Sequence, residues 1–103
     1  MPRTIRKTTA KVRKVNRLAD VPPDKRFYCN DGRIFNNLED LASALKVMSD
    51  DTFRYHANES KNDFSNWISD VIGDGKLARD LRKVTSCVDA ARIVADRVAY
   101  YKK

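Results

Sequence analysis

The sequence predicts a mainly α-helical fold, a compact bundle of about five short helices with one small N-terminal β-hairpin. Apolar residues recur at three- and four-residue spacing in several stretches after residue 37, which places them on one face of a helix. Short polar residues that can cap a helix precede these stretches. Upstream, two short aromatic and β-branched runs flank Asn30-Asp31-Gly32, a pattern typical of a hairpin.

The length and composition of the chain indicate one globular domain. Its 103 residues are 42% hydrophobic and 34% charged, which is typical of a folded chain with a well-charged surface. No apolar run approaches the ~20 residues that a bilayer span requires. The start Met-Pro-Arg-Thr leads into no apolar core of a secretory signal. We therefore expect a cytoplasmic protein, with a basic transit peptide as the alternative.

The net charge of +7 is concentrated at the two ends of the chain. Residues 1–26 hold nine Lys/Arg and two Asp, residues 27–80 hold six basic and ten acidic side chains, and residues 81–103 hold six basic and two acidic ones. A mildly acidic middle thus lies between two basic ends. We predict a basic N-terminal extension at 1–19, a linker at 20–26 and a single helical domain at 27–103.

Residues 1–19 fit two alternatives. At ~100° per residue, four apolar side chains share one arc and the cations lie opposite, as in a basic amphipathic helix. The apolar set is Ile5, Val12, Val15 and Ala19. Three threonines and few strong helix formers fit equally well a tail that orders only on a partner. Val21-Pro22-Pro23-Asp24 then interrupts any helix, which predicts the linker.

The first predicted elements are a hairpin and two helices. Residues 27–29 and 33–35 form the strands, and such a hairpin must pack on the helices that follow. Asn36 and Asn37 open a helix at 38–48. Ser49 caps a short helix that carries Phe53 and His56, and residues 58–61 form a polar loop.

The clearest helix follows the cap Asn62 and ends at Gly73. It carries apolar residues at i, i+3, i+4, i+7 and i+8, each worth roughly 1.5–3 kcal/mol when buried. We place the core around Phe64, Trp67, Ile68 and Leu41.

Two more helices complete the prediction. Asp74 caps a short one with Leu77, Ala78 and Leu81 facing inward. Ser86-x-x-Asp89 resembles a capping box that opens a helix at 87–101. Its expected inward stripe consists of Val88, Ala91, Ala95 and Val98.

The segment from His56 to Ala78 resembles an uncharacterised, mainly archaeal prokaryotic family known by a domain-of-unknown-function label. The shared pattern is His56, then Asn62-Asp63-Phe64-x-x-Trp67-Ile68, then Gly73-Asp74 and Leu77-Ala78, preceded by Phe27, Asp31-Gly32, Leu38 and Leu41. It covers about residues 27–83. The resemblance implies a compact helical domain with a hairpin and implies no activity.

Nothing in the sequence indicates a catalytic or metal site. The only histidine, His56, could pair with Asp63 as a general base, but we favour a structural role. Asn62-Asp63, Glu39-Asp40 and Asp50-Asp51 all fit helix starts. Cys29 and Cys87 form no CxxC, so we expect free buried thiols rather than zinc ligands or a disulfide. With three glycines and no nucleotide-binding motif, we expect no cofactor.

The basic residues at 1–19 have no counter-charge, and no structural need explains them. We therefore predict a non-enzymatic nucleic-acid-binding protein that contacts the phosphates of chromosomal DNA or of ribosomal or other structured RNA. It would be associated with the nucleoid or the ribosome. The predicted contact residues are Arg3, Arg6, Lys7, Lys11, Arg13, Lys14, Arg17, Arg82 and Lys83.

Further side chains could enlarge this surface if the last helix lies beside the extension. They are Arg92, Arg97, Tyr100, Tyr101, Lys102 and Lys103. The alternative is a protein-interaction adaptor whose 27–83 region binds a protein partner. An enzyme that uses His56 and Asp63 is the third possibility.

Overall fold

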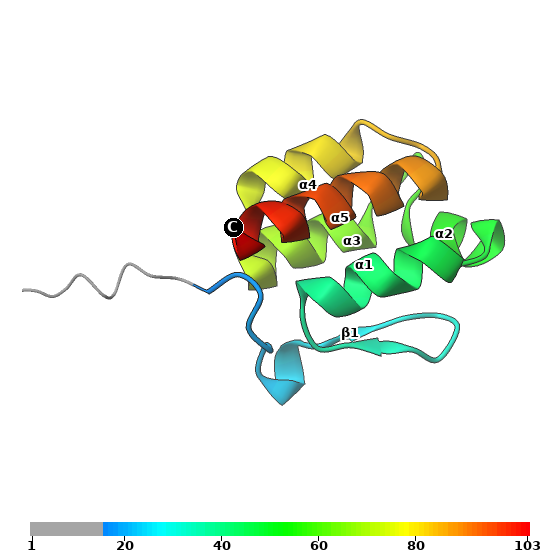
Figure 1. The fold of residues 1–103 in the computed structure, drawn as a ribbon. Helices are drawn as coiled ribbons and strands as arrows, with labels where there is room; N and C mark the ends of the chain where they lie inside the picture. Colours follow the sequence, from blue (N-terminus) through cyan, green and yellow to red (C-terminus); the bar gives the residue numbers. More distant parts are fainter. Residues whose placement is uncertain (1–15) are drawn as a thin grey trace, which may run out of the picture.

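The computed structural model describes residues 16–103 (Figure 1). Over this range it contains a two-stranded antiparallel hairpin and five α-helices, so the predicted mainly α fold is confirmed. The elements are η2 (3-10, Pro23–Lys25), β1 (Phe27–Tyr28), β2 (Ile34–Phe35), α1 (Leu38–Val47), α2 (Asp50–His56), α3 (Asp63–Trp67), η3 (π, Ile68–Ile72), α4 (Gly75–Arg82) and α5 (Cys87–Lys102).

Every helix that was expected from a capping residue begins at that residue. In each case the side-chain oxygen of the cap accepts a hydrogen bond from the backbone N–H three residues later, which satisfies one of the free amides of the first turn. The caps are Asn37, Ser49, Asn62, Asp74 and Ser86.

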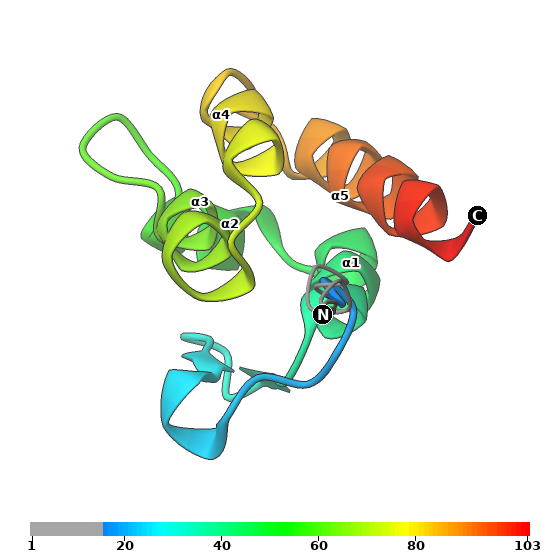
Figure 2. The same ribbon diagram turned by 90° about the vertical axis from the view of Figure 1, so that its left-hand side faces the viewer.

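The hairpin covers one side of the helices, and α5 packs along α1 (Figure 2). Phe27 pairs with Phe35 and Tyr28 with Ile34. Because neighbouring side chains of a strand point to opposite faces, Phe27 and Phe35 are buried with their rings stacked at 5.4 Å. Tyr28 and Ile34 are exposed on the outer face.

The core is built as predicted around Phe64, Trp67, Ile68 and Leu41, all of which are buried. It also takes in part of residues 20–26, the segment expected to be a linker or the entry into the folded domain. Val21 is buried, and its N–H donates to the carbonyl of Asn36 at 2.7 Å. Trp67 Nε1 donates to the Lys25 carbonyl at 2.7 Å. The two prolines stop a helix, but they do not keep this segment from packing on the domain.

The inward face of α5 agrees with the predicted stripe at Val98 and differs from it most at Val88. Val88 is 78% exposed, while the buried side chains are Cys87, Ala90, Val94 and Val98. Two overlapping sets of apolar residues have helical spacing here, and they differ by one residue, about 100° around the axis. The observed set buries Val94, which carries more apolar surface than an alanine. It also buries Cys87, whose thiol donates to the Leu45 carbonyl at 3.2 Å.

The helix predicted from Asn62 to Gly73 changes character at Ile68. Its second half is a π-helical turn in which Gly73 N–H bonds the Ile68 carbonyl at 2.7 Å. Gly73 ends it in the left-handed region with φ 85°, as expected of a glycine stop. The Arg17 guanidinium lies where a Cβ on Gly73 would be, and it donates to the Ile72 carbonyl at 2.9 Å.

This close contact predicts a difference between two glycines of positive φ. Both Gly73→Ala and Gly32→Ala place an alanine in the left-handed region, at a cost of about 1–2 kcal/mol each. Only Gly73→Ala also displaces Arg17, because Gly32 has no atom within 4 Å of its Cβ position. We expect Gly73→Ala to lower the unfolding free energy more in chemical denaturation. The excess should disappear in an Arg17→Gln background; equal costs for the two glycines would contradict the contact.

Candidate nucleic-acid interface

Of the nine predicted contact residues, Arg17, Arg82 and Lys83 belong to the described part of the chain. The other six, Arg3, Arg6, Lys7, Lys11, Arg13 and Lys14, lie outside the described residues, as does most of the predicted basic helix. Residues 17–19, at its end, form a turn in which the Ala19 N–H bonds the Asn16 carbonyl at 3.2 Å.

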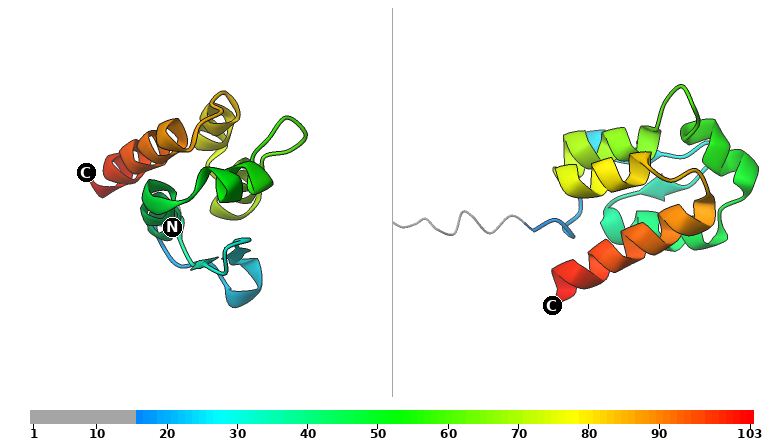
Figure 3. Two further views of the ribbon diagram at one scale, coloured as in Figure 1. Left: turned by 90° about the vertical axis from the view of Figure 1, so that its right-hand side faces the viewer. Right: turned by 90° about the horizontal axis from the view of Figure 1, so that it is seen from above.

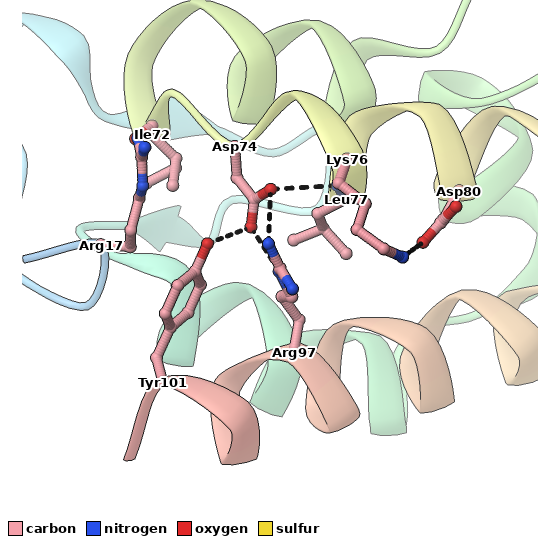
Figure 4. A network of polar contacts seen from close by, with 8 residues as sticks. All are labelled: Arg17, Ile72, Asp74, Lys76, Leu77, Asp80, Arg97 and Tyr101. Carbon is pink, nitrogen blue, oxygen red and sulfur yellow. Dashed lines mark hydrogen bonds and ion pairs between the residues drawn. The ribbon is translucent and has the colours of Figure 1, made fainter. Parts of the chain in front are cut away.

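Arg17 is fixed to the folded domain. Besides its bond to the Ile72 carbonyl, the neighbouring Leu18 packs against the core. Figure 4 shows the Arg17 side chain beside Ile72, at the end of η3. Arg17 is therefore held by the fold, in addition to any contact with phosphate.

Arg82 and Lys83 are exposed at the opposite end of α4. The eight residues of α4 make the helix roughly 12 Å long, at ~1.5 Å per residue. The structure thus separates the predicted residues into two groups instead of gathering them in one place.

Cations that the sequence analysis did not select lie between these groups. Lys76 and Arg79 are exposed on α4, at a spacing of three residues from one another and of four between Arg79 and Lys83. The signal was present in the sequence as a basic stripe opposite Leu77, Ala78 and Leu81. It was missed because only the apolar face of this helix was considered.

A groove of about 770 Å³ adjoins Arg82. It lies between the 57–62 loop, which projects beside α4 (Figures 2 and 3), and the connection from α4 to α5. The lining residues that can contact a ligand through charge or hydrogen bonds include Arg54, Glu59, Lys61, Asn66, Arg82 and Thr85.

Three of the charged side chains that line this groove are cations, and the fourth, Glu59, is a carboxylate. Lys61 forms an ion pair with Asp63 at 3.0 Å. Within the described residues, no carboxylate forms an ion pair with Arg54 or Arg82. Two guanidinium groups are therefore available for an anion such as phosphate, which arginine binds in a bidentate manner.

The cations of α5 are arranged differently. Arg97 pairs with Asp74 at 2.7 Å, Lys102 with Glu39 at 2.6 Å and Arg92 with Asp89 at 3.5 Å. Because these charges already have partners, α5 adds less to a basic surface than we expected from the sequence. Tyr100 is exposed, with the Arg97 guanidinium 4.6 Å from its ring centre.

Asp74 is the most highly connected polar residue of the domain (Figure 4). Its carboxylate caps α4 through the Leu77 N–H and accepts hydrogen bonds from both Arg97 and the Tyr101 hydroxyl. Burial works to raise the pKa of Asp74, but these hydrogen bonds outweigh it and lower the pKa to about 2. The carboxylate is therefore charged at neutral pH and holds α5 against α4.

The His56 ring is buried with both nitrogens bonded. Nδ1 lies 3.0 Å from Asp63 Oδ2, and Nε2 accepts the Asn30 N–H at 2.9 Å. Because Nε2 accepts a hydrogen bond, it carries no proton. The ring proton therefore lies on Nδ1, which donates a hydrogen bond to Asp63. Burial acts to raise the pKa of Asp63, but hydrogen bonds from His56 and Lys61 keep it below its ordinary value. The pair joins the hairpin to the start of α3 and leaves neither ring nitrogen open to a substrate.

The structure also settles the state of the cysteines. Cys29 and Cys87 are buried free thiols, as predicted, and burial raises the pKa of both. Across residues 16–103, no group of three or more His, Cys, Asp or Glu side chains is arranged to hold a metal ion.

None of the helices in the described range combines the length and apolar character needed to cross a membrane. Comparison of the chain with protein-family models, curated proteins and solved structures gives no match in any of the three. The resemblance to an archaeal family therefore stays a prediction, and the interface must be argued from the residues themselves.

The lowered pKa of Asp74 predicts a pH dependence of stability. The pKa of Asp74 in the folded state lies below the ordinary 3.8. The charged carboxylate therefore contributes its full share of the unfolding free energy above about pH 4, and this share is lost as the pH falls through 2. A shift of this size corresponds to roughly 2 kcal/mol. Asp74→Asn should remove it, so the unfolding free energy of this variant should rise less between pH 2 and 5 than that of the natural protein.

The matched control for this experiment is Asp70→Asn, which changes an exposed carboxylate that makes no side-chain hydrogen bond or ion pair within the described range. It should leave the pH profile of the unfolding free energy unchanged. Identical profiles for Asp74→Asn and Asp70→Asn would show that the Asp74 network does not stabilise the fold.

Replacement of His56 tests its structural role. His56→Ala leaves the Asn30 N–H without its acceptor and opens a cavity beside Phe27, whose ring centre is 5.1 Å away. We expect a loss of about 2–4 kcal/mol in unfolding free energy, measured by chemical denaturation. Tyr55→Ala, at the exposed neighbouring position, should cost clearly less. A His56→Ala protein as stable as the original would contradict the assignment.

Proposed function

We propose that this protein is a non-enzymatic nucleic-acid-binding protein that holds the phosphate backbone of chromosomal DNA or structured RNA through its basic N-terminal segment. The observation that carries the proposal is the concentration of charge. Residues 1–19 contain seven Lys/Arg and no acid, whereas the cations of α5 are largely paired with carboxylates. Such an excess is what a polyanion attracts.

The position of Arg17 supports the same function. It ties the end of the segment to the domain at η3, close in sequence to the start of α4. Thr4, Thr8 and Thr9 add hydroxyl groups that can donate to phosphate oxygens. Binding through the backbone carries little base information, so we expect weak sequence specificity and a nucleoid- or ribosome-associated protein.

A second candidate is an adaptor that binds a protein partner. The observation in its favour is the outer face of the hairpin, where Tyr28 is 62% and Ile34 is 48% exposed as a cross-strand pair. Aromatic side chains are enriched at protein interfaces. Binding through such a packed surface would depend much less on salt than binding to phosphates.

Salt titration of the full chain tests the main proposal. Seven phosphate contacts give a log–log slope of affinity against salt of up to about −6 on duplex DNA, or about −5 on single strands. A variant with Gln at the six cations before Arg17 should lose most of this slope in fluorescence anisotropy titrations. Arg17 and Leu18 are left unchanged because they contact the domain.

A variant with residues 2–15 in scrambled order keeps the charge and serves as the control. It should bind nucleic acid nearly as well as the natural sequence if the attraction is directed at phosphates. A natural protein without salt-steep binding to nucleic acid would rule out the proposal, and the hairpin face would then become the surface to test.

A further inference from the structure

Helix α4 presents a basic face that runs across the domain. Arg79 and Lys83 lie four residues apart on its exposed side, opposite the buried Leu77 and Leu81. Arg82 is also exposed and turns toward the groove, which it lines. In Figure 2, α4 lies at the edge of the molecule between the 57–62 loop and α5.

This face connects the two groups of cations already described. Arg17 is fixed beside Gly73, two residues before α4 begins. At the far end, Arg54 lines the same groove as Arg82. The track along α4, roughly 12 Å long, corresponds to between about three and four phosphates of one strand, at ~3.4 Å of helix axis per phosphate.

Acidic residues limit the track on its other side. Asp80 pairs with Lys76 at 2.8 Å, which neutralises that lysine. Asp96 lines, with Asp80 and Arg97, a smaller hollow of about 240 Å³ between α4 and α5. A polyanion is therefore attracted to Arg79, Arg82 and Lys83 and repelled from the side that faces α5.

We propose that Arg79, Arg82 and Lys83, together with Arg54, which lines the groove with Arg82, form a second phosphate-binding surface, the α4 ridge, for a nucleic-acid strand that also contacts the N-terminal segment. This proposal rests on the proposed function and adds a site in the folded domain. The guanidinium groups bind phosphate oxygens. Asn66 and Thr85, which line the groove without a side-chain hydrogen bond inside the described range, supply contacts to sugar and phosphate.

The test compares two full-length variants of equal charge. The ridge variant carries Arg54→Gln, Arg79→Gln and Arg82→Gln. The control carries Arg33→Gln, Lys46→Gln and Arg92→Gln, which are exposed cations on the hairpin, α1 and α5. Affinity for labelled duplex DNA and for single-stranded RNA of the same length is measured over a range of salt concentrations.

Loss of three phosphate contacts should make the log–log slope less steep by about 2 to 3. We expect this change in the ridge variant and little change in the control. If the ridge variant loses more affinity for one of the two nucleic acids, that nucleic acid is the one that the ridge prefers. Equal slopes for the ridge variant and the control would overturn the α4 ridge.

Failure of the ridge is separable from failure of the proposed function. If the Gln substitutions before Arg17 abolish salt-steep binding while the ridge variant matches its control, the segment binds nucleic acid and the ridge does not. If the natural protein lacks salt-steep binding altogether, both proposals fail. Binding to vesicles of anionic phospholipid, lost in the ridge variant, with none to nucleic acid, would also overturn the ridge as a nucleic-acid site.

Discussion

The carboxylate of Asp74 determines how the C-terminal half of the domain is assembled. One buried side chain caps α4, and it also receives Arg97 and Tyr101 from α5. A buried charge is costly unless its lone pairs are satisfied. Separating α5 from α4 would therefore leave the Asp74 carboxylate without the hydrogen bonds of Arg97 and Tyr101. Arg17 contacts the adjoining turn, so the start of α4, the end of α5 and the N-terminal segment all meet here (Figure 4).

The same network decides which cations remain available to a ligand. Arg97 is used by the fold, and Lys102 and Arg92 have acidic neighbours. Helix α4 buries Leu77, Ala78 and Leu81 against the core, and Arg79 and Arg82 are exposed. The basic residues of the C-terminal third are thus divided by the structure into those that join helices and those that can bind an anion.

Most of the fold was predictable because its signals are local. A capping residue acts on an amide three positions away, and the apolar periodicity that follows it identifies a helix without knowledge of its partners. The errors concern contacts between distant residues. Arg17 and the Ile72 carbonyl are 55 positions apart, and Trp67 and the Lys25 carbonyl are 42 apart, so the packing of residues 20–26 had no local signal. The buried face of α5 is set by its packing on α1, and the sequence of α5 alone does not reveal that packing.

The candidate site was predicted only in part. The His56–Asp63 pair was foreseen, but the hydrogen bond from the Asn30 N–H to the other ring nitrogen of His56 was not.

The uneven distribution of charge has a further consequence for binding. A uniformly basic domain would attract a polyanion in many orientations, with little preference among them. Here the acidic pairs Glu39-Asp40 and Asp50-Asp51 lie in the first turns of α1 and α2, where the helix dipole favours them. They also repel phosphate from those regions. Glu39 is partly offset by its ion pair with Lys102. Under the proposed function, a nucleic acid would therefore be directed away from these helix starts and toward the basic N-terminal segment and the α4 ridge. Weak specificity for sequence would then be compatible with a preferred orientation on the strand.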